Sequence, residues 1–330
     1  MRDIITPTDA ALTAERLLTA VRGPVIVGEH RIEVTACIGI APATGQDAQD
    51  LLRDATAAMR QAAALGPDRW EVLGGDIATK TRLELETRAG LRQAMTNEQI
   101  QAWFMPVVDL LDGRTCGYEA LVRWIQQDGS VVAPVDFLDI AERSGVITAI
   151  DRIILSQGLN ALDTMDPQAW IAVNVSAASM SSGDLLDMIR GELDRSGADP
   201  RRLHLEVTET ALFRVTDAVQ AMMQAVADLG VSWWVDDFGT GYSSISHLRD
   251  LPIAGLKLDL SFTQQITGVS RDRPTMLTNG LVGLAHGLGL ATIAEGIETR
   301  RQANILIAQG WTMGQGWLYG KAAPAPGASA

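Results

Sequence analysis

Short apolar segments recur through the second part of the chain, and most of them carry a polar side chain at or just beyond the end of the apolar run. Seven of them lie between residues 115 and 316, and they read TCGYEAL, WIAVNVS, LHLEVTE, SWWVDDFG, GLKLD, LATIAEG and WTMGQG. Stretches of helical periodicity separate them, and this alternation is typical of parallel strands joined by helical crossovers. The pattern therefore predicts an α/β fold with parallel strands, and a closed α/β barrel of about 250 residues would fit within the chain.

The polar residues at the ends of these segments are of types that carry chemistry. In a parallel barrel all the strand ends open on one face, where the active sites of such barrels lie. Any one of these residues alone could be a paired carboxylate or a satisfied buried amide. As a set they predict one shared site, formed by Glu119, Asn174, Glu206, Asp236, Asp237, Lys257, Glu295 and Gln315.

Five of these residues are carboxylates, which would repel one another in an apolar-walled mouth unless cations held them. Oxygen ligands without Cys or His spacing indicate hard cations, Mg²⁺ or Mn²⁺. The adjacent Asp236 and Asp237 could bridge two divalent ions about 3.5–4 Å apart. Lys257 adds a positive charge for a phosphate or for its attacking water. The chemistry that this set predicts is phosphodiester hydrolysis.

Composition excludes several other classes of protein. The chain has 27 Lys and Arg against 40 Asp and Glu, a net charge of −13, so a general DNA or RNA binder is disfavoured. No apolar run approaches the roughly 18 residues of a membrane segment, and MRDIITPTDA lacks the features of a signal peptide. We therefore expect a cytoplasmic protein.

The first hundred residues have a different pattern. RIEVTACIGIA, residues 31–41, alternates like a half-buried strand, and the following helix should be capped by Asp47 and stopped by Gly66. RWEVL is the next predicted strand. Charged helix formers from Asp76 onward predict a connecting helix over residues 76–97. At the other end, residues 324–330 are rich in Ala and Pro and are predicted to be disordered.

The motifs of the second part resemble the EAL-type cyclic di-GMP phosphodiesterase family. YEALVRW contains the naming triplet at Glu119-Ala120-Leu121, and NVS, EVTET, DDFGTGYSS, LKLD, AEGIET and QGW follow in the family's order. The resemblance covers residues 98–323. It implies a (β/α)8 TIM-like barrel, a homodimer formed through this domain, and metal-dependent hydrolysis of cyclic di-GMP to linear pGpG.

The resemblance also implies a role for each matching position. It makes Lys257 the residue that orients the water, Glu295 a general base or metal-linked acid, and Glu209 the residue that steadies the Asp-Asp loop. The implied first-ion ligands are Glu119, Asn174, Glu206 and Asp236, with Asp236 and Asp237 serving the second ion. The implied substrate-binding residues are Leu121, Arg123, Glu298 and Gln315, of which Arg123 is suited to a phosphate.

Three positions depart from the family pattern. Met105-Pro106-Val107 stands where the family commonly has Gln-Pro-Ile, so a polar contact to the nucleotide is lost. Leu260 follows Lys257-Leu258-Asp259 where an arginine is usual, and Lys321-Ala322 replaces the final basic residue and proline. None of them is an implied metal ligand, so we expect altered binding rather than lost catalysis.

Residues 1–75 resemble the C-terminal half of a GGDEF (diguanylate cyclase-like) domain. Gly74-Gly75-Asp76 comes after the last predicted strand of this segment, so it is not the signature loop. The resemblance implies that upstream sensory and GGDEF portions lie in a longer parent chain, and that this chain alone cannot cyclise GTP.

Two other functions compete with hydrolysis of cyclic di-GMP. A non-catalytic cyclic di-GMP receptor is the first, with Met105 as its best support. A glycosidase that uses Glu206 and Glu295 as its acid/base pair is the second. It leaves Asn174, the paired aspartates and Lys257 unexplained, and aromatic residues make up only 5% of the chain, which leaves few platforms for sugars.

Overall fold

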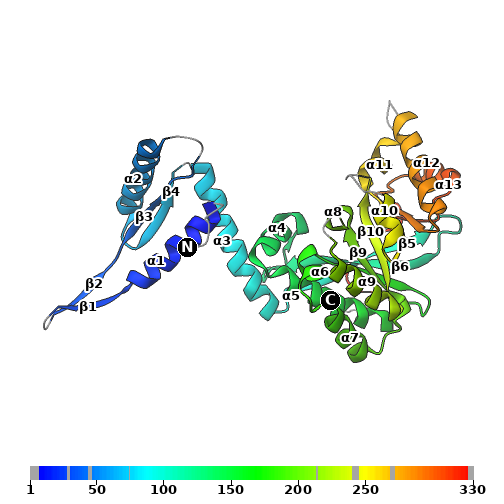
Figure 1. Ribbon diagram of the computed structural model, residues 1–330, viewed down its shortest axis with the longest axis horizontal. Coiled ribbons are helices and arrows are strands. Elements are labelled where there is room, and N and C mark those ends of the chain that lie inside the picture. Colours follow the sequence, from blue (N-terminus) through cyan, green and yellow to red (C-terminus); the bar gives the residue numbers. More distant parts are fainter. Residues whose placement is uncertain are drawn as a thin grey trace. The chain divides into compact units, whose positions relative to one another are not determined.

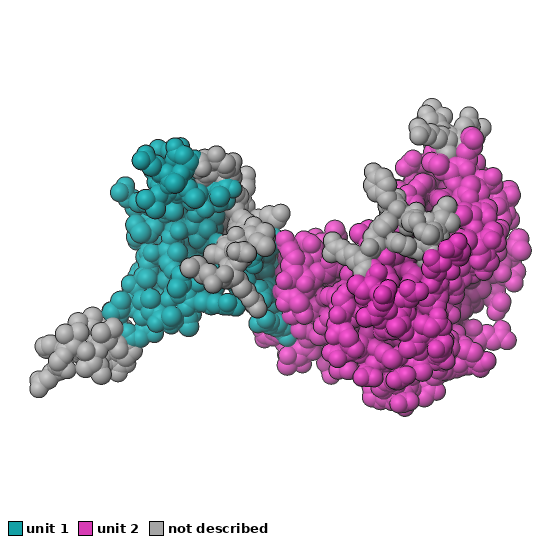
Figure 2. All heavy atoms as spheres, in the orientation of Figure 1, with its two compact units in different colours: residues 1–92 teal, residues 93–330 magenta. Residues whose placement is uncertain are grey.

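The computed structural model describes residues 7–27, 30–43, 47–73, 75–212, 215–239, 245–267 and 272–325. The chain divides into two compact units, Met1–Arg92 and Gln93–Ala330 (Figure 2). Within the described residues, no helix combines the length and apolarity needed to cross a bilayer. Most of the predicted disordered tail, residues 326–330, lies outside the described part of the chain.

The N-terminal unit contains two small sheets. One is an antiparallel hairpin of β1 and β2, and the other pairs β3 with β4 in parallel through α2 (Figure 1). The elements are α1 (Pro7–Val21), β1 (Gly23–Val27), β2 (His30–Val34), β3 (Cys37–Ile40), α2 (Ala48–Leu65), β4 (Arg69–Val72) and α3 (Gly75–Thr96). Helix α3 covers the segment for which a connecting helix is predicted.

In this unit the predicted helix after Asp47 is confirmed, and the predicted strand over residues 31–41 is not. Asp47 caps α2, since its side chain accepts from Asp50 N at 2.8 Å, and Gly66 ends the helix with a φ of 134°. The single strand predicted over residues 31–41 is wrong. Its two halves belong to β2 and β3, which pair with different strands: β2 with β1 directly before it, and β3 with β4 beyond α2.

The second unit is a closed barrel of eight strands, which confirms the predicted (β/α)8 TIM-like fold (Figure 1). Strand β5 pairs with β13 on one side and with β6 on the other, which closes the ring. The strands are β5 (Ile100–Asp109), β6 (Thr115–Ile125), β8 (Trp170–Asn174), β9 (Leu203–Thr208), β10 (Ser232–Phe238), β11 (Ile253–Leu258), β12 (Ala291–Ala294) and β13 (Met313–Gln315), with the short β7 (Val131–Val132) added to β6.

Strand β5 departs from the parallel arrangement because it runs antiparallel to both of its neighbours. Only a short turn separates β5 from β6, and Asp109 closes it by accepting from Leu111 N at 2.8 Å. A turn of this length can join only antiparallel strands, because a parallel crossover needs a dozen or more residues. The other seven strands are those that the seven apolar segments predict.

Helices follow the parallel strands along the chain (Figure 1). On one side Val282 of α12 and Leu306 of α13 pack with Leu258 of β11 and Ala294 of β12. The helices are α4 (Pro134–Ser144), α5 (Ile147–Ala161), α6 (Ala177–Ser181), α7 (Leu185–Ser196), α8 (Glu209–Leu212), α9 (Asp217–Asp228), α10 (Ile245–Asp250), α11 (Leu260–Gln265), α12 (Asp272–Gly287) and α13 (Arg300–Gln309).

Three stacked rings fill the barrel below the level of the predicted site. The His204 imidazole lies between the indoles of Trp170 and Trp234, with ring centroids 4.3 and 5.3 Å apart. These residues precede predicted site residues on the same strands by two or four positions, so they share the inward face. Gly117 and Gly255 make room for them, because a Cβ atom at either position would collide with an indole ring.

Burial of His204 predicts a measurable loss of stability in acid. Burial lowers the pKa of His204 to about 4. Because the unfolded pKa is about 6.5, only the unfolded chain gains a proton between these values, and stability falls as pH decreases through this window. From pH 7 to pH 5 the loss due to His204 is about 2 kcal/mol.

This loss should be absent from His204→Phe, which keeps an aromatic ring in the stack. Thermal unfolding at pH 7 and pH 5 should show a smaller pH-dependent drop in melting temperature for this variant than for the wild type. His286→Gln, at an exposed histidine, is the matched control and should behave like the wild type. Equal pH dependence of His204→Phe and the wild type would contradict the prediction.

Candidate active site

The ammonium group of Lys257 lies at the centre of four carboxylates. Its Nζ atom is 2.7 Å from Glu295 Oε1, 2.8 Å from Glu206 Oε2, and 3.2 Å from both Glu119 Oε2 and Asp236 Oδ1. These five residues, called the Lys257 cluster below, lie on β6, β9, β10 and β11 and, for Glu295, directly after the end of β12. The Lys257 side chain is completely buried. Four carboxylates around one ammonium carry a formal charge of −3 when every group is ionised.

Two amide side chains hold the cluster from the neighbouring strands. Asn174 Nδ2 donates to Glu119 Oε1 at 3.0 Å. Gln315 Nε2 donates to Glu119 Oε2 at 2.7 Å and to Glu295 Oε1 at 2.8 Å. Both oxygens of Glu119 are therefore held, and the structure brings residues 119 and 315 into contact across the closed barrel.

The carboxylates form two overlapping groups that could each hold a metal ion. One consists of Glu119, Glu206 and Asp236, and the other of Asp236, Asp237 and Glu295, with ligand atoms within 4.8 Å of one another in each group. Asp236 belongs to both. All the donors are oxygens, which is the set preferred by Mg²⁺ and Mn²⁺. The residues present therefore fit divalent hard cations.

The close packing of these charged groups shifts their pKa values. Burial raises the pKa of Glu295 to about 8, against the opposing charge of Lys257. Burial and the nearby carboxylates raise the pKa of Glu206 well above its ordinary value. Burial alone would lower the pKa of Lys257, but the four carboxylates raise it well above its ordinary value. Lys257 is therefore a fixed positive charge, and protons or metal ions must neutralise several of the acids.

Glu119 differs from the other acids. Burial by itself would raise its pKa, but the charge of Lys257 and the hydrogen bonds from Gln315 and Asn174 hold it below its ordinary value. Glu119 is therefore the member of the cluster that stays ionised most readily. An ionised carboxylate is ready to bind a cation without first releasing a proton.

Asp237 has an unusual backbone conformation at the end of β10. Its φ is 54°, in the left-handed region that a residue other than glycine seldom occupies. Burial and the carboxylates of Asp236 and Asp259 raise its pKa to about 6. Two residues later, Gly239 N donates to Glu209 Oε2 at 2.9 Å, so Glu209 contacts the start of the loop that follows. Residues 240–244 of this loop lie outside the described residues.

Three of the predicted substrate-binding residues lie at the rim, whereas the fourth, Gln315, is buried beside Glu119 and Glu295. Leu121 and Arg123 follow Glu119 along β6, and the Arg123 guanidinium lies over the Trp103 ring of β5, 5.7 Å from its centroid. Glu298 lies in the loop after β12, where its backbone N donates to Gln302 Oε1 at 3.0 Å in the cap of α13.

Sequence reasoning missed Asp151, which lies outside the motifs. Its carboxylate accepts hydrogen bonds from Ser176 N at 3.0 Å, from Ser176 Oγ at 2.6 Å and from Ser179 Oγ at 2.6 Å. Ser176 caps α6 two residues after Asn174, so Asp151 fixes the chain where it leaves β8. In the sequence, the one indication of this role is that Asp151 is an acidic residue in an otherwise apolar helical segment. Its serine partners are 25 and 28 residues away in the sequence, so the pattern does not reveal the contact.

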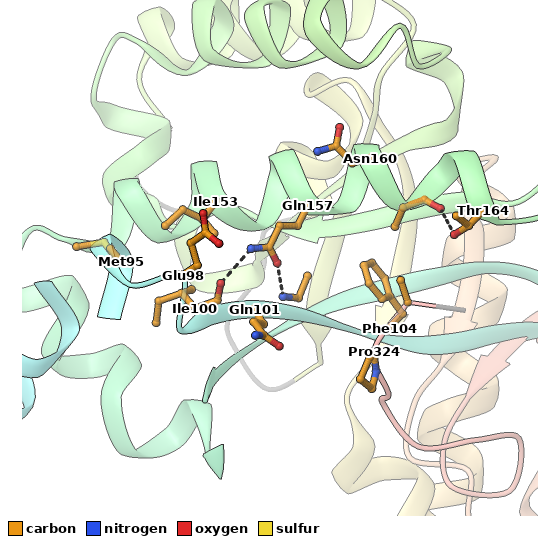
Figure 3. Close-up of a pocket in the computed structure, with 13 residues that line it drawn as sticks. Met95, Glu98, Ile100, Gln101, Phe104, Ile153, Gln157, Asn160, Thr164 and Pro324 are labelled. Carbon is orange, nitrogen blue, oxygen red and sulfur yellow. Dashed lines mark hydrogen bonds between the residues drawn. The ribbon is translucent and has the colours of Figure 1, made fainter. Parts of the chain in front are cut away.

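Two of the cavities beside the barrel bear on the location of the site. The larger, with a volume of about 600 Å³, lies against the outer side of β5 and contains none of the predicted site residues (Figure 3). There Gln157 accepts from Ala102 N at 2.7 Å and donates to Ile100 O at 3.0 Å. The smaller, of about 210 Å³, is lined by Leu121, Asn174 and Asp151 among others, and so adjoins the predicted site.

A closed eight-stranded barrel with buried acids at the carboxyl ends of its strands defines the class: a TIM-like barrel protein with an acidic site able to bind divalent cations. Residues 88–322 match the EAL domain, and the chain belongs to this family.

Similar proteins from Pseudomonas aeruginosa support this assignment. The chain is 30% identical to the cyclic di-GMP phosphodiesterase NbdA over 98% of its length. It is 34% identical to the bifunctional diguanylate cyclase/cyclic di-GMP phosphodiesterase MucR over 97% of its length. It spans about half the length of these curated relatives, 42% and 47% respectively.

Solved structures show the same fold. The PaMucR phosphodiesterase in its c-di-GMP complex matches with a TM-score of 0.69 and 34% identity, covering 73% of this chain and 98% of that one. The EAL enzyme Bd1971, in its form with cAMP and cyclic di-GMP bound, matches with a TM-score of 0.72 and 25% identity, covering 86% of this chain and 75% of that one.

Proposed function

We propose that this chain hydrolyses cyclic di-GMP to linear pGpG with the help of two divalent ions, Mg²⁺ or Mn²⁺. The observation that carries the proposal is the pair of overlapping carboxylate groups that share Asp236 beside the buried Lys257. Two ions in such a site activate water and stabilise charge on the attacking and leaving oxygens of a phosphodiester. The named activities of NbdA and MucR support the choice of substrate.

The ligand assignment uses residues that already contact one another. Glu119, Asn174, Glu206 and Asp236 would hold the first ion, and Asp236 and Asp237 the second. Glu209, through its contact with Gly239, would keep Asp237 in place. Leu121, Arg123 and Glu298 at the rim would bind the nucleotide, together with Gln315 beside the Lys257 cluster.

The reacting groups of the protein are Lys257 and Glu295. The Lys257 ammonium would hold the attacking water and offset charge on the phosphoryl oxygens. Glu295 would accept the proton of that water as the water oxygen bonds to phosphorus and the bond from phosphorus to one ribose oxygen breaks, and the leaving ribose oxygen would take up a proton from solvent to become a hydroxyl group. Burial raises the pKa of Glu295 to about 8, and bound cations would favour its ionised form at neutral pH.

The test is chromatography of cyclic di-GMP incubated with the protein and Mg²⁺ or Mn²⁺. We expect pGpG to accumulate, and we expect excess EDTA to abolish its formation, because four clustered acids without cations cannot all ionise. Excess Mg²⁺ added after EDTA should restore turnover. Hydrolysis that is unaffected by EDTA would contradict the two-metal mechanism.

The second candidate, a receptor that binds cyclic di-GMP without cleaving it, rests on Met105. In the register of β5 and β6, Met105 lies opposite Glu119, so an apolar side chain stands beside the site. Calorimetric titration of the same sample separates the two functions. Binding without pGpG formation would favour the receptor, and absence of binding would exclude both.

We also propose that this chain is part of a longer, cytoplasmic signalling protein that forms a homodimer through its EAL domain. Residues 1–75, which precede the EAL match, would be the C-terminal half of a GGDEF-like domain, with sensory and GGDEF portions upstream. In this proposal residues 76–97 connect to a barrel of residues 98–323, and residues 324–330 form a tail. MucR, named for both activities and only about half covered, supports this arrangement.

A further inference from the structure

The hairpin of β5 and β6 turns one face toward the mouth of the barrel. In its register Met105 pairs with Glu119, Trp103 with Leu121, and Gln101 with Arg123. Cross-strand partners and alternate residues share a face, so all of these side chains are on the face that bears Glu119.

Burial distinguishes the two faces of this hairpin. On the opposite face of β5, Ile100, Ala102 and Phe104 are buried. Trp103 and Met105 are only partly buried, and Gln101 is exposed. The face that carries Trp103 therefore forms an open wall above the Lys257 cluster.

Two features of Trp103 indicate a ligand. The guanidinium of Arg123 lies over its ring, which makes a flat, positively charged surface beside the site. Its indole Nε1 is buried, and no atom of the described residues accepts its hydrogen. A buried donor without an acceptor is unfavourable, and a ligand atom that accepts this hydrogen would remove the cost.

We propose that Trp103 is a substrate-binding residue that contacts one purine base of the cyclic dinucleotide. The base lies against the Trp103–Arg123 pair, and the indole N–H, which lies in the plane of the ring, donates to a ribose oxygen of the same nucleotide. Met105, next on the same face, extends this surface with an apolar side chain. The proposal deepens the proposed function and rests on it, because it presupposes that the mouth binds cyclic di-GMP.

The test compares two phosphodiesters, of which only one carries purine bases. Trp103→Ala should raise the KM for cyclic di-GMP about tenfold or more, since stacking of one base on an aromatic ring contributes substantially to binding. Its kcat should change less than about twofold, since Trp103 does not contact the Lys257 cluster. Its rate with bis(p-nitrophenyl) phosphate, which has no purine, should equal that of the wild type.

Trp103→Phe keeps a ring and loses only the N–H donor, so it should raise the KM by a smaller factor. Trp70→Ala is the matched control, because Trp70 lies in β4 of the N-terminal unit, outside the barrel, where its indole N–H donates to Glu15 Oε1 at 2.7 Å. It should leave the KM within about twofold of the wild type.

An unchanged KM in Trp103→Ala would overturn the proposal, and so would an equal loss with both substrates. If Trp103→Ala fails to fold, Trp103→Phe decides by the same two criteria. These results are distinct from a failure of the proposed function, because in that case the wild type itself would neither cleave nor bind cyclic di-GMP.

Discussion

Replacement of Lys257 by methionine is expected to reduce hydrolysis of cyclic di-GMP by about 10²–10⁴-fold, the range lost when a group that assists proton transfer is removed. Methionine has a similar length and no charge. Lys257 Nζ is within 3.2 Å of four carboxylates, and it is the cation that these four residues share. The variant would therefore lose both the group proposed to hold the water and the positive charge proposed to face the phosphate.

The same variant should also be less stable without metal. Removing one partner of a buried ion pair costs about 3–5 kcal/mol, because the other charge is left uncompensated. In this site the acids would take up protons instead, so the cost should be smaller at pH 5 than at pH 8. Mn²⁺ should recover stability without recovering turnover.

Thermal unfolding with and without Mn²⁺, together with the pGpG assay, checks these results. Arg53→Met is the matched control, because its side chain is 73% exposed in α2 and it should leave both quantities unchanged. Turnover near the wild-type rate in Lys257→Met would show that the ammonium has no role in catalysis.

Replacement of Glu119 by alanine is the second large effect. Loss of a residue that supports a metal ligand typically costs 10–100-fold in metal affinity or activity, so loss of the ligand itself should cost more than about 100-fold. Glu119 also positions Asn174 and Gln315, which both donate to its carboxylate. Its removal therefore disturbs three proposed functional groups at once.

Metal-dependent stabilisation gives a readout apart from activity. A cation at about 100 times its Kd should stabilise the wild type by about 2.7 kcal/mol. In Glu119→Ala this gain should largely vanish, whereas the metal-free melting temperature should fall less than in Lys257→Met, because three carboxylates still surround the ammonium. Asp187→Ala, with a side chain 86% exposed, is the control. An undiminished response to Mn²⁺ would exclude Glu119 as a ligand.

Much of the candidate site was visible in the sequence because parallel strands place their carboxyl ends together. Residues such as Glu119, Asn174 and Glu206 each end an apolar segment, and the closed sheet brings them within hydrogen-bonding or ionic contact. In the N-terminal unit the sequence pattern predicted α2 and its caps correctly, but it predicted one strand where the structure has two, β2 and β3. Pairing partners decide where a strand ends, and an alternating pattern does not reveal them.

Sequence by itself was sufficient for the α/β class of fold and the set of acids, because these depend on periodicity and on residue types near the ends of segments, and the motifs around Glu119 and Asp236 resembled those of the EAL family. Only the tertiary structure decided the antiparallel direction of β5, which results from a short turn, and the wall that this strand forms with β6. It also decided that Lys257 is surrounded by four carboxylates, that Asp151 holds the chain after Asn174, and that Arg123 lies over Trp103. Each of these depends on distances between residues far apart in the chain, which packing determines and local pattern does not.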